Sequence, residues 1–488
     1  MPLPYSQAMT EAAAPTLTSR QVWWWVLLPL LGTWIPPFFD LDEGFYAAIV
    51  SEMSRRGDWI TPFYNGAPWF EKPILIYWAA LIPYQLFGSF APEFAMRLPS
   101  GVATMVTAWI LTRWLAATGR EPSAGVVALI YGSMLLPVVM GHLMTPDALF
   151  VMCLAGALST FFKSLEVPKF RVATGFWLGM GVLAKGPVTL AFFGAFLIWQ
   201  YLGEKELRPA WRGGWLGGIA VMVAVICTWY LPCYLVNREL FVQEFLIEQN
   251  VNRFLGGDTA HRTPFWMTPI YFPVILLIAA LPWSLRAIRS RTLWKECADY
   301  RYAARWLVLV TVFFSISQSK LPHYILPAFP ALAMVAAISV APGDIRRLTG
   351  QARWTIGIVT ALVAGGLVWW GGASGQLEAR DELRLAKSAL PGAPIVLFQL
   401  PKQEGIVYEA RLQQTSLPSM VAYANRVVLM TSEPEDLDAQ PAGDSLLFTR
   451  TGRITPEVAE AIRTHGGEIE LITGTAGGAF ESYRLRRP

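Results

Sequence analysis

The chain contains 488 residues, of which 54% are apolar and 15% are charged, and its formal net charge is +4. Together with 21 tryptophans, this balance excludes an ordinary soluble protein and predicts a helical membrane protein with several crossings. The Lys and Arg residues are scattered among short loops and form no basic face, so nucleic acid is excluded as a partner. Four cysteines lie in or beside apolar segments, which predicts neither a disulfide framework nor a thiolate metal site.

Apolar runs long enough to cross a hydrocarbon core of about 30 Å recur from Val22 to Trp370. The first run lacks a small-residue cleavage site, so we expect it to remain as the first helix. A run at 74–87 is short and contains Pro83, which favours an interfacial or re-entrant helix. The others predict about eleven transmembrane helices, near residues 22–37, 99–115, 124–140, 148–162, 172–183, 187–202, 215–235, 266–285, 306–317, 324–340 and 354–370.

The distribution of Lys and Arg predicts the orientation of these helices. If the run at 74–87 does not cross, the strongly basic loops all lie on one side, and the positive-inside rule makes this side cytoplasmic. Among these loops are those with Arg113, Lys169 and Arg208, and the segment 286–305. We therefore expect a cytoplasmic N-terminus, a membrane domain over 1–375 and an outer-face juxtamembrane loop at 38–98.

The remainder of the chain has a different character. From residue 376 onward, charges, turn residues and short apolar runs alternate, which predicts a soluble domain over 376–488. Strand-like runs occur at 395–398, 427–430, 446–449 and 469–472, and Thr455 can cap a helix that starts with Pro456 and stops at Gly466. The predicted fold class is an all-α polytopic membrane protein with a small C-terminal α/β domain, which the threading places in the periplasm.

Five polar clusters fall on the outer face of this threading, at 40–53, 70–73, 142–147, 252–262 and 319–327. Ionisable groups at the ends of apolar helices are costly unless they are paired or face a wet cavity, so their convergence predicts a functional site. Asp42 and Asp147 are the candidate catalytic carboxylates, and Glu43 lies beside the first of them. Both aspartates also have a simpler interpretation as helix caps.

Basic side chains in these clusters predict an anionic ligand. A phosphate fits, because Arg offers two parallel hydrogen bonds, Lys offers a point charge, and a tyrosine adds a neutral donor. For any single Lys, snorkelling towards lipid headgroups is the simpler interpretation. The candidate phosphate-binding residues are Lys72, Lys185, Arg253, Arg262, Lys320 and Tyr324.

Three of the four histidines, His142, His261 and His323, lie on the same outer rim. With Glu71 or Glu248 they could hold a divalent ion, although no HxxxH or HxH spacing occurs. Hydrogen bonding from these histidines to a substrate is the favoured alternative.

Several motifs resemble a known family. They are similar to those of the bacterial aminoarabinose transferases that modify lipid A and, more widely, of the protein O-mannosyltransferases in the GT-C superfamily. In chain order they read DEGFYAAIVSEMSRRGDWITPFYNGAPWFEKPILIYW, FAMRLPS, LMTPDALF, LAKGP, HRTPFW and SKLPHYILP. The resemblance runs from Asp40 to about Pro330. It implies a GT-C fold in the bacterial inner membrane and inverting transfer of a sugar from a polyprenyl-phosphate carrier to lipid A or another envelope glycan or lipid.

The resemblance also assigns roles. Asp42 matches the family's catalytic aspartate, and Lys72 and Tyr324 match residues that hold the carrier phosphate. Arg253 or Arg262 supplies the phosphate-binding arginine, and Asp147 and Lys185 also match family positions. The expected reaction requires no cofactor, and a divalent metal is the alternative. Its expected partners are the lipid-linked donor, the lipid or glycan acceptor and the surrounding membrane lipids.

The chain departs from the aminoarabinose pattern at Phe45, where those enzymes usually carry Arg, and near Glu248, where a histidine is missing. A protein O-mannosyltransferase and an exopolysaccharide glycosyltransferase are alternatives that differ in the acceptor. A lipid or solute transporter would need internal repeats with broken helices, and none is recognisable in the sequence. An inactive scaffold is disfavoured because Asp42, Lys72 and Tyr324 are all retained.

Overall fold

The computed structural model describes residues 27, 30–40, 42–204, 213–252, 267, 269–295, 297–317, 320–400, 417–474 and 478–487. The chain forms two compact units, each built from separate stretches of sequence. Unit 1 comprises Met1–Leu31, Phe70–Ala79 and Arg97–Val363, and unit 2 comprises Gly32–Trp69, Ala80–Met96 and Ala364–Pro488.

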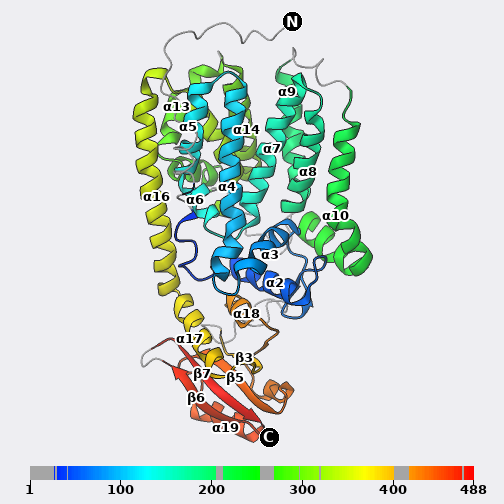
Figure 1. Ribbon diagram of the computed structural model, residues 1–488, viewed down its shortest axis with the longest axis vertical. Coiled ribbons are helices and arrows are strands. Elements are labelled where there is room, and N and C mark those ends of the chain that lie inside the picture. The colour runs from blue at the N-terminus through cyan, green and yellow to red at the C-terminus, as the bar shows by residue number, and fades with distance from the viewer. Residues whose placement is uncertain are drawn as a thin grey trace. The chain divides into compact units, whose positions relative to one another are not determined.

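The described part of unit 1 is mainly helical (Figure 1). Three helices contribute residues to both units, namely α3 (Leu75–Phe87), α4 (Pro92–Ala117) and α16 (Ile345–Ala373). The other helical elements of unit 1 are α5 (Glu121–Gly132), α6 (Leu135–Gly141), α7 (Pro146–Glu166), α8 (Phe170–Lys185), α9 (Val188–Gly203), α10 (Leu216–Phe241), η3 (Val242–Asn252), α12 (Tyr271–Ala279), α13 (Trp283–Arg289), η5 (Arg291–Trp294), α14 (Ala298–Ile316), η6 (Pro322–Ala328), α15 (Phe329–Ile338) and η7 (Pro342–Asp344).

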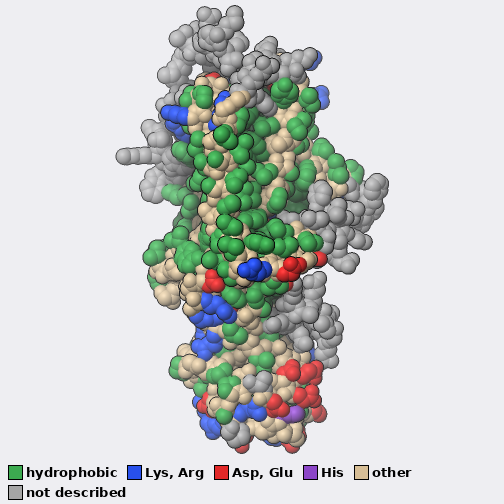
Figure 2. All heavy atoms as spheres, turned by 90° about the vertical axis from the view of Figure 1, so that its right-hand side faces the viewer, with side chains coloured by type: hydrophobic (Ala, Val, Ile, Leu, Met, Phe, Trp, Pro, Cys, Tyr) green, Lys and Arg blue, Asp and Glu red, His purple; other side chains and the backbone are tan. Residues whose placement is uncertain are grey.

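Four helices in the described part are long and apolar enough to cross a membrane, and the number rises to six if each of two bent pairs counts as one span. The four are Pro92–Ala117, Pro146–Glu166, Leu216–Gln249 and Arg346–Ala373. The bent pairs overlap two predicted spans, at 124–140 and 266–285, and bend by 65° and 111°. Exposed apolar side chains cover helices such as α10, and Figure 2 shows an extensive apolar surface on one face. These helices confirm a polytopic membrane protein, whereas the predicted number of about eleven spans stays a prediction.

Small residues let the helices of unit 1 pack closely. A Cβ atom on Gly175 of α8 would lie 1.9 Å from the carbonyl oxygen of Gly218 in α10, and one on Gly156 of α7 would lie 2.5 Å from the ring of Trp177 in α8. Contact between lipid-embedded helices depends on this kind of backbone approach, because apolar burial gives them little driving force.

Unit 2 combines the first loop with the C-terminal part of the chain. The loop contributes α2 (Asp42–Arg56) and a hairpin of β1 (Phe63–Tyr64) and β2 (Ala67–Pro68). The C-terminal part contains a five-stranded mixed sheet in the order β4-β3-β5-β7-β6 (Figure 1). Its elements are α17 (Gln376–Ala389), β3 (Ile395–Phe398), α18 (Ser419–Ala424), β4 (Leu429–Thr431), η8 (Pro434–Ala439), β5 (Gly443–Arg450), α19 (Pro456–Thr464), β6 (Glu468–Gly474) and β7 (Phe480–Arg487).

The sheet confirms the predicted α/β character of the tail. All four predicted strands are present, and β3 has the predicted bounds. The predicted helix is α19, in which the Thr455 hydroxyl accepts a hydrogen bond from the Val458 amide. Strand β7, which pairs antiparallel with both β5 and β6, was not predicted from the sequence. Its sequence, FESYRLRR, has few apolar residues and therefore gives a weak strand signal. Cross-strand ion pairs of Arg484 with Glu470 and of Arg486 with Asp444 stabilise the charged strand in the sheet.

We expect Gly175→Ala to destabilise the contact between α8 and α10. The added methyl group must displace backbone, and overpacking of this kind costs about 1–3 kcal/mol. Thermal unfolding in detergent should show a melting temperature lowered by several degrees. Gly194→Ala in α9 is the matched control, because its Cβ atom would meet nothing within 4 Å. Equal melting temperatures for the two variants would contradict the predicted close contact.

Candidate functional site

Asp147 and Lys185 form an ion pair in unit 1. Asp147 lies in the first turn of α7 and Lys185 is the last residue of α8, so each charge has the favourable sign for its helix terminus. The side chain of Asp147 is only 4% exposed and that of Lys185 is 22% exposed. A single buried charge would be costly in these apolar surroundings, and the pair offsets part of that cost.

Two sequence motifs explain how these side chains are placed. In the motif around Asp147, Pro146 fits the first turn of α7, so that the carboxylate follows at the helix terminus. After Lys185, Gly186 adopts a positive φ of 77°, which ends α8 and leaves the ammonium group at its C-terminus. The motifs TPD and LAKGP thus fix helix ends as well as charges.

Other predicted residues of unit 1 surround this pair. The Lys185 Nζ atom lies 5.2 Å from the centre of the Tyr324 ring, which belongs to η6. Lys72 and His323 also interact electrostatically with the Asp147 carboxylate. The structure therefore brings together five residues that the sequence analysis had selected from four separate motifs.

Lys72 makes a second, weaker ion pair. Its Nζ atom lies 2.7 Å from Oε1 of the adjacent Glu71, and the two side chains are 19% and 25% exposed. Ion pairs with solvent access contribute little net energy. Lys72 can therefore transfer its hydrogen bond from Glu71 to an anionic ligand at small cost.

Lys320 is placed differently from Lys72. It is 3% exposed, and its Nζ atom donates to the carbonyl oxygens of Ser315, at 3.2 Å, and Ser317. These carbonyls lie at the C-terminal end of α14, where a cation stabilises the helix. In this arrangement Lys320 caps a helix, and a contact with a phosphate would require it to leave these carbonyls.

The histidines and glutamates that were predicted to bind a metal or a substrate lie in different environments. His142 is fully buried, and its Nδ1 and Nε2 atoms lie 2.8 Å and 3.3 Å from the carbonyl oxygens of Val138 and Leu31. Glu248 is exposed on η3. Within the described ranges, no group of three or more His, Cys, Asp or Glu side chains is arranged to hold a metal ion. The predicted residues Arg253, His261 and Arg262 lie outside the described residues.

In unit 2, Asp42 is the first residue of α2 and is exposed. Among the described residues its carboxylate has no hydrogen bond or ion pair. The neighbouring Glu43 is buried, and its Oε2 atom accepts a hydrogen bond from the backbone amide of Phe39 at 2.6 Å. Glu43 thus satisfies a backbone amide before the helix, whereas Asp42 is exposed.

Asp40 has a role that the sequence analysis did not assign. Its Oδ1 atom accepts a hydrogen bond from the Ser419 amide at 2.9 Å, and its Oδ2 atom accepts one from the Ser419 hydroxyl. Ser419 begins α18, which lies far along the chain. Burial raises the pKa of Asp40 to about 8, although the hydrogen bonds from Ser419 oppose this rise. No local pattern in the sequence could have revealed this partner.

The β1–β2 hairpin was also missed, although a signal existed. Asn65 and Gly66 both have positive φ angles, of 48° and 90°, and join the paired strands as a two-residue turn. An Asn-Gly pair is a strong hairpin signal. The Asn65 side chain then bonds to the backbone of Val428, donating to its carbonyl at 3.0 Å and accepting from its amide at 2.8 Å.

Phe45, the departure from the family pattern, is buried beside this hairpin. Its ring stacks on Trp69 with centres 5.3 Å apart and contacts the Tyr64 ring at 4.8 Å. The aromatic side chain therefore fills the contact between α2 and the hairpin, a position that a solvated arginine could not occupy without losing this packing.

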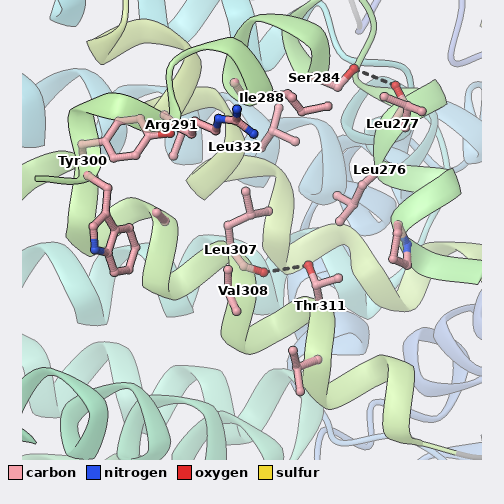
Figure 3. A pocket seen from close by; sticks show the side chains of 16 residues that line it. Leu276, Leu277, Ser284, Ile288, Arg291, Tyr300, Leu307, Val308, Thr311 and Leu332 are labelled. Atoms are coloured by element: carbon pink, nitrogen blue, oxygen red, sulfur yellow. Dashed lines mark hydrogen bonds between the residues drawn. The ribbon is translucent and has the colours of Figure 1, made fainter. Parts of the chain in front are cut away.

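A separate cavity of about 550 Å³ lies among α12, α13, α14 and α15 (Figure 3). Its walls are mainly aliphatic, and the hydroxyls of Ser284 and Thr311 are bonded to the carbonyls of Leu277 and Leu307. Arg291 is the charged residue of the lining. None of the predicted site residues that the structure describes borders this cavity, which suits hydrocarbon rather than polar chemistry.

The chain is similar in sequence to a family of membrane glycosyltransferases. The profile of the family described as dolichyl-phosphate-mannose-protein mannosyltransferase matches residues 71–231. An undecaprenyl phosphate-alpha-4-amino-4-deoxy-L-arabinose arabinosyl transferase of Pseudomonas aeruginosa is 30% identical over 94% of this chain and 81% of its own length. The proteins of the same name from Aeromonas salmonicida and Sodalis glossinidius are also 30% identical, but the chain matches only 56% and 66% of their length.

The fold has a solved counterpart. The crystal structure of ArnT from Cupriavidus metallidurans bound to undecaprenyl phosphate is similar with a TM-score of 0.77 and 17% sequence identity. The similarity covers 96% of this chain and 98% of that protein. It therefore extends over both the helical unit and the C-terminal sheet, and shows a GT-C fold.

We expect Lys185→Met to destabilise unit 1, because it leaves the Asp147 carboxylate buried without its partner. Breaking a buried pair in this way costs about 3–5 kcal/mol. The double variant Asp147→Asn, Lys185→Met should recover most of the lost stability in denaturant unfolding of the detergent-solubilised protein. If the double variant is as unstable as Lys185→Met alone, the ion pair is not what stabilises these helix ends.

Asp40 predicts a pH dependence of stability. Its folded-state pKa of about 8 lies above the ordinary value of 3.8, so the folded protein holds the proton more tightly than the unfolded chain. The contribution of Asp40 to the free energy of unfolding therefore falls as the pH rises from about 4 to about 8. Melting temperatures measured across this range should decline less in Asp40→Asn than in the wild type, and parallel profiles would contradict the raised pKa.

Proposed function

The chain belongs to the family of undecaprenyl phosphate-alpha-4-amino-4-deoxy-L-arabinose arabinosyl transferases, and we propose that it transfers this aminosugar from undecaprenyl phosphate to lipid A. The observation that carries the proposal is the relationship with the Pseudomonas protein, which extends over 94% of the chain. The cluster of Asp147, Lys185, Tyr324 and Lys72 supports it, since a phosphate carrier requires cations of this kind.

We further propose the topology that the basic loops predict. In this topology the protein crosses the bacterial inner membrane about eleven times. Its N-terminus lies in the cytoplasm, and the first loop and the C-terminal domain lie in the periplasm. The turn at Gly375, which has a φ of 80° between α16 and α17, supports a boundary between membrane domain 1–375 and soluble domain 376–488. The 13-residue α3 suits an interfacial helix better than a complete span.

In our proposal the cations bind the phosphate of the donor. When the bond between the anomeric carbon and the phosphate oxygen breaks, the carrier leaves as a phosphate whose negative charge must be stabilised. Lys72 and Tyr324 provide this stabilisation, with Arg253 or Arg262 as the arginine that the family pattern contains. A preorganised donor is worth about 2.7–4 kcal/mol in other enzymes. Lys185 is already paired with Asp147, so we assign this pair to placing η6 and its Tyr324.

Asp42 is the base in this proposal. An acceptor oxygen of lipid A attacks the anomeric carbon from the side opposite the phosphate, which inverts its configuration, and its proton passes to the Asp42 carboxylate. The exposure of Asp42 and its lack of a bond to any described residue support this role, because a base that is already engaged in a cap could not accept the proton. General-base catalysis typically contributes 10²–10⁴-fold. No step in this scheme requires a metal or an organic cofactor.

A second acceptor has a specific observation in its favour. The profile of the dolichyl-phosphate-mannose-protein mannosyltransferase family matches residues 71–231, which include Lys72, Asp147 and Lys185. Transfer of a sugar to protein would use the same donor chemistry with a different acceptor. Transfer to an exopolysaccharide would also use this donor chemistry. A mass-spectrometric comparison of lipid A, glycoproteins and polysaccharide in cells with and without the gene separates these acceptors.

We expect Asp42→Asn to lower kcat for aminoarabinose transfer by about 10²–10⁴-fold, because it removes the base. Lys72→Ala should lower kcat/KM for the lipid-linked donor by about 10²–10³-fold. Purified protein in lipid vesicles, supplied with the undecaprenyl-phosphate donor and lipid A, provides the assay. Asp344→Asn is the control, since Asp344 is also exposed but lies outside the candidate site. An Asp42→Asn protein with wild-type kcat would remove Asp42 from the mechanism.

A further inference from the structure

Within unit 2, α18 of the C-terminal part packs against α2 at a point of backbone approach. A Cβ atom on Gly44 would lie 1.9 Å from the Asp40 Oδ1 atom and 2.6 Å from the backbone nitrogen of Ser419. A side chain at Gly44 would therefore separate the two elements. This contact occurs two positions after Asp42 in the sequence, at the start of α2.

Hydrogen bonds from α18 also hold the chain before Asp42. Both carboxylate oxygens of Asp40 accept hydrogen bonds from Ser419, one from its amide and one from its hydroxyl. The backbone amide of Phe38 donates to the Tyr423 hydroxyl at 2.9 Å, and this contact is buried. The chain is thus attached to α18 at Phe38 and Asp40 and packed against it at Gly44, while Asp42 lies between these points.

The α18 side of these contacts is itself fixed. The Tyr423 hydroxyl donates to Oε1 of the buried Glu93 at 3.1 Å. Glu93 also accepts hydrogen bonds from Arg380 at 3.2 Å and Arg384 at 2.9 Å, both on α17. A buried carboxylate with three donors is well satisfied, so these hydrogen bonds hold α17 and α18 in a fixed position relative to Glu93.

We propose that Ser419 is a positioning residue for Asp42, and that the C-terminal part of the chain sets the direction of the Asp42 carboxylate by holding Asp40 and the start of α2. This inference rests on the proposed function of Asp42 as the base. It gives the C-terminal part a task in catalysis without a reacting group of its own. A displacement of about 1 Å in a reacting group can cost 10²-fold in rate, so a positioning hydrogen bond has a measurable effect.

The ionisation of Asp40 offers a readout that a purely structural role would not move. Both oxygens of Asp40 accept hydrogen bonds from Ser419, which is the pattern of the ionised carboxylate. Its pKa of about 8 is raised by burial and by the charge of Glu43, and lowered by the two Ser419 bonds. Among the described residues, Tyr64 on β1 also interacts electrostatically with Asp40. Loss of the Ser419 hydroxyl should therefore raise the pKa of Asp40 further.

The experiment compares pH profiles of kcat and the donor KM for four full-length variants in vesicles with the undecaprenyl-phosphate donor and lipid A. Ser419→Ala should lower kcat about 10–100-fold, leave the donor KM nearly unchanged, and move the acidic limb of the profile to higher pH. Asp40→Asn, which cannot ionise, should also lower kcat, and its profile should lose the part of the acidic limb that Asp40 sets. Ser388→Ala is the matched control, because among the described residues the Ser388 hydroxyl bonds only to Leu385 of its own helix. Asp42→Asn reports on the base itself.

The outcomes separate the two hypotheses. An inactive Asp42→Asn together with Ser419→Ala that has the wild-type kcat and pH profile would overturn the positioning role and leave the proposed function standing. An active Asp42→Asn would overturn the proposed base and with it the premise of this inference. If Ser419→Ala does not fold, Asp40→Asn decides the matter, because an unchanged acidic limb in that variant would show that Asp40 does not control activity.

Discussion

Charged groups in this protein lie at the ends of apolar helices, and each must find a partner or solvent, because burial of a lone charge costs several kcal/mol. Asp147 and Lys185 meet this constraint by pairing across the ends of α7 and α8. Lys320 meets it with the carbonyls of α14, and Glu93 meets it with two arginines and a tyrosine. These solutions decide which ionisable residues remain available for chemistry. Among the described residues, Asp42 is exposed and Lys72 pairs with the partly exposed Glu71, so both remain open to a substrate.

The same constraint distinguishes structural charges from reactive ones. Asp147 and Lys185 occupy motif positions, yet their mutual pair and helix-end locations give them a structural task that is sufficient to explain them. Tyr324 is placed against Lys185 by this arrangement. In the transfer reaction that we propose, the leaving group is a phosphate, so stable placement of a few donors is the main requirement and no strong acid is needed.

The C-terminal part of the chain is not an independent attachment. Unit 2 is assembled from three stretches of sequence, and its contacts join residues that are far apart in the chain. Asn65 in the hairpin completes the backbone bonding of Val428, Phe38 bonds to Tyr423, and Asp40 bonds to Ser419. Because buried hydrogen bonds fix orientation more strictly than apolar contact does, the first loop receives its geometry from the other end of the sequence.

The sequence by itself determined the membrane class, the α/β character of the tail and the motif residues, because hydropathy, periodicity and turn residues are local properties of a chain. It also contained the Asn-Gly signal of the hairpin. Only the tertiary structure decided that Lys320 caps a helix, that Glu43 rather than Asp42 bonds to the backbone before α2, and that β7 completes the sheet despite its many charges. The link between Asp40 and Ser419 is the clearest case. A hydrogen bond between residues so distant in sequence depends on how the chain folds back on itself, and neither residue has a local pattern that identifies the other.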